Sequence, residues 1–143
     1  MSIQLDEMFM QVVHLHHHRA HNLLNDIGLY RGRPHILFYL QEHRDCSQKQ
    51  LADHMRLKPA TVTVVLGRME KDELIERRQD EVDARVSRVN ITQKGLDLCQ
   101  KATEQFALLR EGMYKGFSQE EIELLLSFYG RMRANLTVSE KKG

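Results

Sequence analysis

The sequence predicts a mostly α-helical fold with one small β-hairpin, arranged as a winged helix-turn-helix between two helical ends. Residues 47–95 read in order as two short helices, a strand, a charged turn, a second strand and the start of another helix. The segments on either side repeat apolar residues at helical spacing, which predicts amphipathic helices there. In a winged unit one helix enters the major groove of DNA, and the hairpin, called the wing, lies beside it.

The composition is ordinary for a globular chain and argues against several other classes. The chain has 143 residues, which suit one domain, with 41% hydrophobic and 29% charged residues. No apolar run approaches the ~18 residues that span a bilayer, and residues 1–11 do not have the pattern of a signal peptide. The two cysteines are far apart, which favours reduced thiols. We therefore expect a cytoplasmic protein with no membrane partner.

Net charge alone does not decide whether the partner is a nucleic acid. The formal net charge is +1 for the whole chain. Residues 44–94 carry eleven Lys and Arg against nine Asp and Glu, a local charge of +2. The positive sign suits DNA, but the excess is small for a nucleic-acid binder.

The N-terminal part predicts two helices. The first is expected over residues 6–25, with Gly28 placed to end it. Its apolar face comprises Leu5, Met8, Phe9, Val12, Leu23 and Ile27. Pro34 suits the first turn of a second, short helix that ends near His43.

The middle part contains the helix-turn-helix and the hairpin. Ser47 and Gln50 have the spacing of a capping box, which predicts a helix start. After a turn at 57–58, Pro59 predicts the start of the next helix. Its inward stripe comprises Val62, Val65, Leu66 and Met69. Residues 75–79 and 85–91 are predicted strands, and 80–84 is the turn between them.

The C-terminal part predicts two more helices with surplus apolar surface. Thr92 is the expected cap of the first, and Ser118 with Glu121 forms the capping box of the second. This surplus predicts a homodimer, within a single domain 1–143, in which residues 1–30 and 95–143 dimerise around a winged lobe at about 31–94. The alternative is a monomer that folds these helices onto its own core.

The helix that starts at Pro59 presents small and polar residues opposite its buried stripe. Small side chains let a helix enter the ~12 Å major groove, and Thr hydroxyls or methyl groups can contact base edges. Arg68 is better placed for a phosphate. Gly67 suits either a close backbone approach or simple tolerance. The DNA-contact candidates of the two short helices are Ser47, Lys49, Lys58, Pro59, Ala60, Thr61, Thr63, Val64 and Arg68. An ordinary solvated surface is the alternative.

The turn at 80–84 and its flanking arginines form the candidate wing. Asp80 and Asp83 suit turn geometry. Arg85 lies just past the turn, where it can enter a narrow minor groove of negative potential. The arginines expected at phosphates are Arg77, Arg78 and Arg88. The alternative is a surface hairpin whose arginines pair with its acids, although an Asp83–Arg85 contact would also hold that arginine in position.

A set of short motifs in this stretch resembles the multiple-antibiotic-resistance regulator (MarR) family. They are LA-x₄-L from Leu51, the TVT segment, R-M-E, L-I-E-R, D-x-x-D-x-R in the wing, and the closing I-T-x-K-G. Each is weak alone, but their order and spacing are specific together. The resemblance implies a homodimeric repressor whose affinity for its operator is changed by a small molecule, a metal or an oxidant.

Two departures from the family pattern bear on DNA affinity. The family commonly has D-R-R in the wing, whereas this chain has Asp83, Ala84 and Arg85. The segment before the wing is also acidic, with Glu70, Asp72, Glu73 and Glu76. We expect both features to weaken nonspecific binding to DNA.

Five of the eight histidines lie within residues 14–21. Four of them share the polar face of the first helix, and they form i, i+4 pairs that suit a divalent transition metal: His14, His17, His18 and His21. No cofactor is otherwise required. A pH-dependent or ligand-binding role and a solvated helix face are the alternatives. His16 falls on the apolar face instead, where we expect a buried or interfacial histidine.

A ligand pocket for an unknown small-molecule effector is expected where the first helix, the Pro34 helix and the helix after Thr92 meet. Its candidate residues are His16, Arg33, His35 and Phe38. Cys99 is expected in the core. Cys46 is expected in a loop beside Arg44, and a reactive thiol is the less favoured interpretation there.

These features favour a sequence-specific, DNA-binding transcriptional regulator over an enzyme. The only candidate catalytic centre is the histidine cluster, which has no carboxylates beside it. The remaining alternatives are a metal-responsive regulator that uses the histidine cluster, and a winged-helix protein–protein module that does not bind DNA. Binding that weakens steeply with salt would separate a DNA-binding regulator from the other classes.

Overall fold

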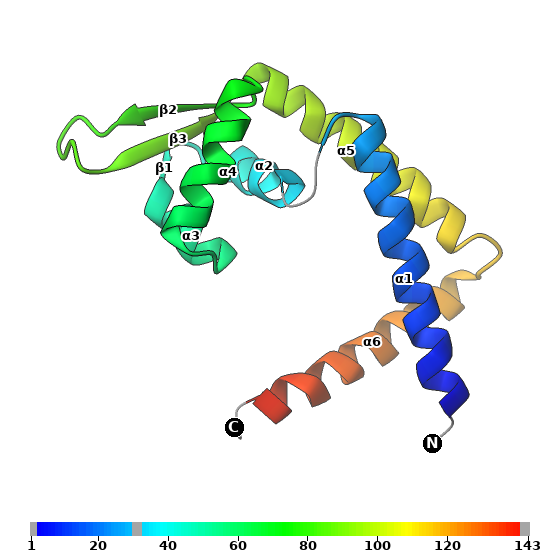
Figure 1. Ribbon diagram of the computed structural model, residues 1–143. Coiled ribbons are helices and arrows are strands. Elements are labelled where there is room, and N and C mark those ends of the chain that lie inside the picture. Colours follow the sequence, from blue (N-terminus) through cyan, green and yellow to red (C-terminus); the bar gives the residue numbers. More distant parts are fainter. Residues whose placement is uncertain (1–2, 30–32, 141–143) are drawn as a thin grey trace. The chain divides into compact units, whose positions relative to one another are not determined.

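The computed structural model describes residues 3–29 and 33–140, and it confirms a mostly helical fold with a small antiparallel sheet (Figure 1). Its elements are α1 (Ile3–Asp26), α2 (Arg33–Glu42), β1 (Cys46–Ser47), α3 (Gln48–Met55), α4 (Pro59–Lys71), β2 (Ile75–Gln79), β3 (Ser87–Ile91), α5 (Gln93–Met113) and α6 (Gln119–Glu140). Contacts group the chain into two units, residues 1–107 and 108–143. None of the helices in the described ranges is long and apolar enough to cross a membrane.

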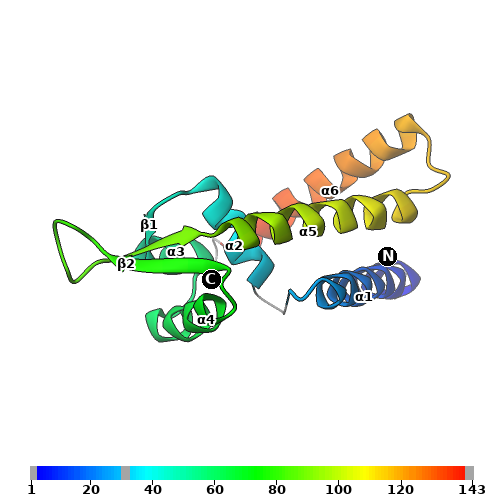
Figure 2. The same ribbon diagram turned by 90° about the horizontal axis from the view of Figure 1, so that it is seen from above.

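The sheet has three antiparallel strands in the order β1-β3-β2. The predicted hairpin is confirmed, with Ile75 opposite Ile91 and Gln79 opposite Ser87, although β3 begins at Ser87 and not at residue 85. The turn that joins β2 and β3 extends away from α2, α3 and α4 in both views (Figures 1 and 2). The two-residue strand β1 was not predicted, because nothing within so short a segment shows the alternation of a strand.

Four predicted helix starts are confirmed, three of them by side-chain caps and that of α4 by its proline. The Ser47 hydroxyl accepts from the Gln50 amide at 3.0 Å, and the Gln50 side chain accepts from the Ser47 amide at 2.8 Å. Pro59 is the first residue of α4. The Thr92 hydroxyl accepts from the Gly95 amide at 3.1 Å at the start of α5. Ser118 and Glu121 make the reciprocal bonds at the start of α6.

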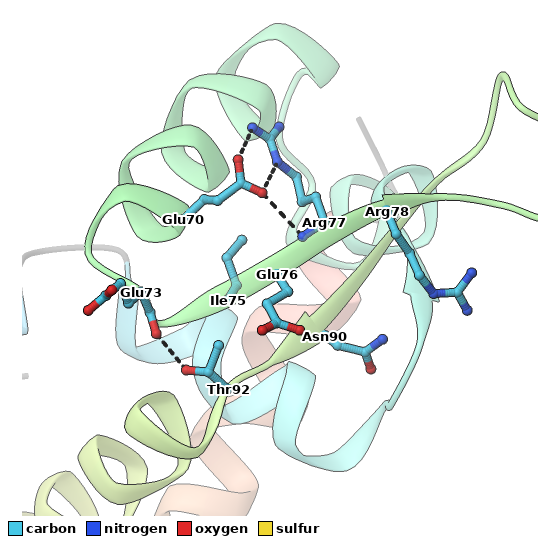
Figure 3. Close-up of a pocket in the computed structure, with 8 residues that line it drawn as sticks. All are labelled: Glu70, Glu73, Ile75, Glu76, Arg77, Arg78, Asn90 and Thr92. Carbon is cyan, nitrogen blue, oxygen red and sulfur yellow. Dashed lines mark hydrogen bonds and ion pairs between the residues drawn. The ribbon is translucent and has the colours of Figure 1, made fainter.

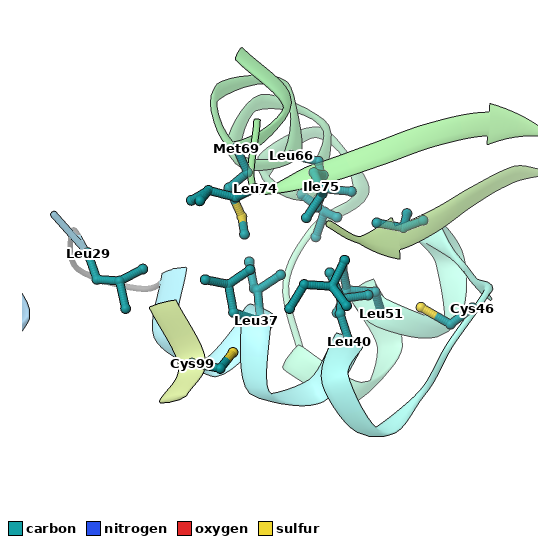
Figure 4. Close-up of a cluster of buried hydrophobic side chains, with 14 of the residues drawn as sticks. Leu29, Leu37, Leu40, Cys46, Leu51, Leu66, Met69, Leu74, Ile75 and Cys99 are labelled. Carbon is teal, nitrogen blue, oxygen red and sulfur yellow. The ribbon is translucent and has the colours of Figure 1, made fainter. Parts of the chain in front are cut away.

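The core of the first unit lies between α2, α3, α4, the sheet and the start of α5 (Figure 4). The predicted inward side of α4 is confirmed, since Val62, Leu66 and Met69 are fully buried. Cys99 lies in this core as expected, and burial raises the pKa of its thiol. The core therefore fixes α4 by one side and leaves its other side in solvent.

The expected loop position of Cys46 is wrong. Cys46 lies in β1 opposite Val89 and is 6% exposed. Burial is the main reason why the pKa of its thiol is raised. Since the thiolate is the reactive form, this environment argues against a reactive cysteine here.

Helix α1 extends further than predicted and ends at the predicted place. Gly28 has φ +81°, and the Leu29 amide donates to Leu24 at 2.8 Å, which closes the helix end. None of the described residues of α1 is buried. His16 is exposed in the described chain, so burial within the chain is not observed, and the alternative of an interfacial histidine stays a prediction.

Large apolar side chains also remain exposed on α6, taken by itself. Those of Leu124, Leu126, Phe128, Met132 and Leu136 are 44–71% exposed. Apolar surface of this extent marks an interaction site more often than a solvated face. Taken by themselves, α1 and α6 thus each expose apolar side chains that the sequence assigned to a dimer.

Gly95 is required by a close backbone approach at the start of α5. A Cβ atom at this position would overlap the Leu74 carbonyl oxygen and lie 2.6 Å from Ile91. This packing joins the start of α5 to the open end of the hairpin, where β2 begins and β3 ends. A Cβ atom at Gly67 of α4 would meet only the Arg77 guanidinium, at 3.8 Å.

Replacing Gly95→Ala should lower the free energy of unfolding by about 1–3 kcal/mol, because the methyl group overpacks a tight contact. The matched variant Gly67→Ala should be neutral or gain up to about 1 kcal/mol, since alanine favours a helix interior. Urea unfolding of both variants at one protein concentration measures the difference. Equal stability of the two variants would contradict this account of Gly95.

Candidate nucleic-acid interface

Helix α4 presents the predicted small and polar face to solvent. Ala60, Thr61, Thr63, Val64 and Arg68 are all exposed, opposite the buried stripe. Pro59 and Lys58 are exposed at the N-terminal end, where Lys58 is the N-cap residue. Helix N-termini favour anions through their unpaired amides and dipole. This end of α4 thus suits a DNA backbone, and the adjoining face suits base edges.

The Thr63 hydroxyl is already positioned by two hydrogen bonds. It donates to the Pro59 carbonyl at 3.0 Å and accepts from the Gln48 side chain at 2.7 Å. A hydroxyl has one proton, so Thr63 can offer a partner only a lone pair and its methyl group. Sequence reasoning missed Gln48, because its link to Thr63 exists only when α3 and α4 pack together.

Glu70 connects α4 to the wing strand β2. Its carboxylate accepts from the Arg77 guanidinium at 3.1 Å and from the Arg77 backbone amide at 3.2 Å (Figure 3). These bonds lower the pKa of the Glu70 carboxyl. The Arg77 guanidinium also lies beside Gly67. The helix and the hairpin are therefore held together by a charged contact as well as by the core.

Asp80 organises the turn at the tip of the wing. Its carboxylate accepts from the amides of Val82 and Asp83 at 3.1 and 3.0 Å, and from the Arg88 side chain at 2.8 Å. These bonds, led by the one from the Asp83 amide, lower the pKa of Asp80 to about 2. The predicted place of Asp80 in the turn is confirmed. Its carboxylate stabilises the turn by bonding to the turn amides and to Arg88 on the opposite strand.

The remaining wing arginines are paired as well. Arg85 contacts Asp83 at 3.0 Å, yet its side chain stays 90% exposed at the tip. The Arg78 side chain contacts Asp45 at 2.8 Å. All four arginines predicted to contact DNA from the hairpin thus have a carboxylate partner in the isolated chain. For Arg85 this is the geometry in which an acid holds an arginine outward.

Other predicted contacts lie at the surface of the two short helices. Lys49 is exposed in the first turn of α3. Ser47 is half-buried, and its hydroxyl serves as the cap of α3. Together with Lys58 and Arg68, Lys49 supplies positive charge on the same two helices that carry the polar face of α4.

A groove of about 460 Å³ lies beside the junction of α4 and the hairpin (Figure 3). It is lined by Glu70, Glu73, Ile75, Glu76, Arg77, Arg78, Asn90 and Thr92. This groove differs from the predicted ligand pocket and includes none of its residues. Its three glutamates place the predicted acidic segment beside the base of the wing.

The structure describes three of the four predicted pocket residues and does not test the pocket. His16 and His35 are exposed, whereas Phe38 is partly buried against the core. The side chain of Arg33 lies outside the described residues. The ligand pocket therefore stays a prediction.

The histidines of the metal hypothesis are all exposed on α1. The Nε2 atom of His18 lies 3.3 Å from the Asn22 side-chain nitrogen, and that of His21 lies 3.0 Å from the Asn25 nitrogen. Within the part of the chain that the structure describes, no group of three or more potential ligands forms a metal site. A metal bound at the Nε2 atom of His18 or of His21 would displace these asparagine contacts.

Comparison with known proteins gives a consistent set of relatives. The sequence model of the MarR family matches residues 29–87. The HTH-type transcriptional repressor IacR of Pseudomonas putida is 29% identical over 103 residues, which are 72% of this chain but only 62% of IacR, less than two thirds of its length. The HTH-type transcriptional regulator YsmB of Bacillus subtilis is 31% identical over 107 residues, covering 74% of this chain and 73% of YsmB.

A solved structure supports the fold. The complex of S. aureus MepR with DNA matches with a TM-score of 0.73 at 23% identity, covering 91% of this chain and 96% of MepR. At this identity the likeness establishes the fold. The fold predicted from the sequence is therefore confirmed independently of the motifs.

The low pKa of Asp80 predicts that its contribution to stability is lost in acid. The unfolded-state pKa is roughly 3.9, so the stabilisation is complete above that value and disappears as the pH falls towards 2. Asp80→Asn removes the charge that faces Arg88, while its side-chain oxygen still accepts from the turn amides. We expect the wild type to melt above this variant at pH 6 and the gap to close between pH 4 and 2.

The exposed neighbour Glu81 provides the control, because Glu81→Gln removes the same charge from the same turn. Melting temperatures of the three proteins across this pH range make the comparison. A gap between wild type and Asp80→Asn that persists unchanged to pH 2 would show that the charge of Asp80 is not its source.

Proposed function

The chain belongs to the MarR family of transcriptional regulators, and from this premise we propose that it is a homodimeric repressor that binds a pseudo-palindromic operator and responds to a small molecule. The family is one of transcriptional regulators and not of enzymes. The observation that carries the proposal is the exposed small and polar face of α4, held beside an arginine-bearing hairpin by the Glu70–Arg77 contact. That combination suits a duplex better than a folded protein surface.

The two elements have different tasks in the proposed complex. The face of α4 from Ala60 to Val64 enters the major groove, where its small side chains allow close approach. Lys49, Lys58 and Arg68 neutralise phosphates and position the protein. Arg85 reaches the minor groove from the wing tip, held outward by Asp83. Isolating the duplex fragments that the purified protein binds tests the premise that these contacts are made to DNA.

Dimerisation follows from the uncovered apolar faces. Apolar side chains at the start of α1 and along α6 are exposed in the chain, including Met8, Phe9, Phe128 and Met132. A second copy is the economical cover for both faces, because closed two-fold symmetry is the commonest form of a homo-oligomer. A two-fold dimer presents two copies of α4, the proposed recognition helices. To enter two half-sites of one operator, they would lie about one helical turn of DNA apart.

The effector is proposed to act on the separation of the two recognition helices. A molecule that binds one arrangement of the dimer more tightly shifts the population towards it. The proposed pocket involves His16, Arg33, His35 and Phe38. Compounds that raise the melting temperature of the chain should also change its affinity for selected operators. Stabilising ligands that leave operator affinity unchanged would contradict this mechanism.

Arg85→Ala should weaken operator binding by about 1–3 kcal/mol, since it removes a groove contact. Arg68→Ala should weaken operator and random duplexes alike, because a phosphate contact does not depend on sequence. Fluorescence anisotropy at fixed salt, with both duplexes, measures the two effects. Operator affinity unchanged in Arg85→Ala would show that the wing does not read DNA.

The proposed dimer predicts a single species of twice the chain mass in analytical ultracentrifugation at micromolar concentration. Met132→Glu should shift it towards monomer, because a charge on an apolar face resists burial. Ser127→Glu lies about 140° away around α6 and is the matched control. A monomer at all concentrations of the wild type would rule out the dimer.

A metal-responsive regulator and a protein–protein module are the alternatives to this function. If the histidines of α1 bind zinc, calorimetric titration should show saturable binding that is lost in His14→Ala/His18→Ala or in His17→Ala/His21→Ala. It should also weaken in acid, because protonated imidazole is not a metal ligand. No saturable binding would leave these histidines as a solvated face. A wild type that selects no duplex would favour the module.

A further inference from the structure

Asp45 lies where the turn after α2 meets the outer face of the hairpin. Strand β1 begins at the next residue, and its pairing places Cys46 opposite Val89. Asp45 is thereby brought beside Asn90 of β3. In β2, Arg77 lies on the side of the hairpin that contacts α4, so Arg78 lies on the other side by the alternation of a strand. Asp45 and Arg78 thus meet across β3.

The contacts of Asp45 reach both strands of the wing. Its backbone amide donates to the Asn90 side chain at 2.7 Å, and its carboxylate accepts from that side chain at 3.1 Å. The Arg78 guanidinium donates to both carboxylate oxygens at 2.8 Å. The Arg88 guanidinium donates to the Asp45 carbonyl at 3.3 Å. One residue outside the hairpin therefore joins β2 and β3 at their outer face.

The backbone at Asp45 is specialised for this position. Its φ is +56°, in the left-handed region that aspartate and asparagine tolerate better than most residues. Arg88 continues the connection to Asp80 at 2.8 Å, and Asp80 holds the turn at the wing tip. A chain of polar contacts thus runs from the turn after α2 to the tip of the wing.

We propose that Asp45 is a positioning residue for the wing, and that it removes Arg78 from the residues that contact DNA. The proposal rests on the proposed DNA-binding function and assigns Arg78 a different role from the phosphate contact predicted from the sequence. The charge of Arg78 is used within the protein, where it fixes β2 to the turn after α2. The wing then presents Arg85 to DNA from a fixed base.

The dependence of DNA affinity on salt distinguishes the two roles of Arg78. Each phosphate contact that a protein loses reduces the slope of log K against log salt by about 0.9 on duplex DNA. Arg78→Ala should leave this slope unchanged on a random duplex, whereas Arg68→Ala should reduce it by about one contact. A reduction in Arg78→Ala equal to that in Arg68→Ala would overturn the proposal.

A double-mutant cycle tests the positioning role on a selected operator. Asp45→Gly removes the carboxylate and accepts the positive φ without strain. It and Arg78→Ala should each weaken operator binding about two- to five-fold, the range of a surface ion pair. The double variant should bind no more weakly than the weaker single variant, because both changes open one contact. Additive losses would overturn the proposal. Asp45→Asn, which keeps the backbone and the side-chain volume, replaces Asp45→Gly if the latter does not fold.

Hydrogen exchange of the whole 143-residue chain without DNA separates this proposal from the proposed function. Exchange of amides in 76–90 should quicken in Asp45→Gly and Arg78→Ala, and not in Glu42→Gln, which removes an exposed charge three residues before Asp45. Unchanged exchange in Asp45→Gly and Arg78→Ala would overturn the positioning role of Asp45, even if the wild type binds DNA. A wild type whose duplex binding is absent or insensitive to salt would instead refute the proposed function, and with it the role assigned to Arg78 at DNA.

Discussion

The burial of one side of α4 is the constraint on which the other features depend. Val62, Leu66 and Met69 are fully inside the core, so the rotation of this helix about its axis is fixed by hydrophobic packing. The opposite side then has to face solvent, and it carries Ala60, Thr63 and Val64. The same core sets the hairpin beside α4, because Ile75 and Val89 are buried in it. The face of α4 that is proposed to contact DNA is thus the side opposite the packed one.

Charge on this surface is compensated within the protein. Each arginine of the hairpin has an acidic partner: Glu70 for Arg77, Asp45 for Arg78, Asp83 for Arg85 and Asp80 for Arg88. Exposed ion pairs add little stability, but they do hold side chains in one geometry. A small net charge and paired arginines reduce the sequence-independent attraction to phosphates. Under the proposed function, sequence-specific contacts would then account for a larger share of the affinity.

The helices at the two ends of the chain bury far less of their apolar surface than the winged helix-turn-helix part does. Their helices are amphipathic, yet α1 has no buried residue in its described part and α6 exposes most of its apolar side chains. Helices of this kind gain stability by packing an apolar face, since isolated helices are marginal in water. Under the proposed function, a second copy of the chain would cover these apolar faces. Periodicity placed His16 on the apolar face of the helix, and in the described part of α1 its side chain is exposed.

The sequence by itself determined all the described elements except β1, and it determined which side of α4 is buried. Local signals sufficed for the caps at Ser47, Thr92 and Ser118, for Pro59 at the start of α4, and for the strand pairing around 80–84. Only the tertiary structure decided which polar groups meet. Strand β1 exists because Cys46 pairs with the edge of β3. The contacts of Asp45, Gln48 and Glu70 are made to residues 33, 15 and 7 positions away in the sequence, on other elements. Periodicity reports which face of an element is buried, whereas contacts between separate elements depend on how those faces pack.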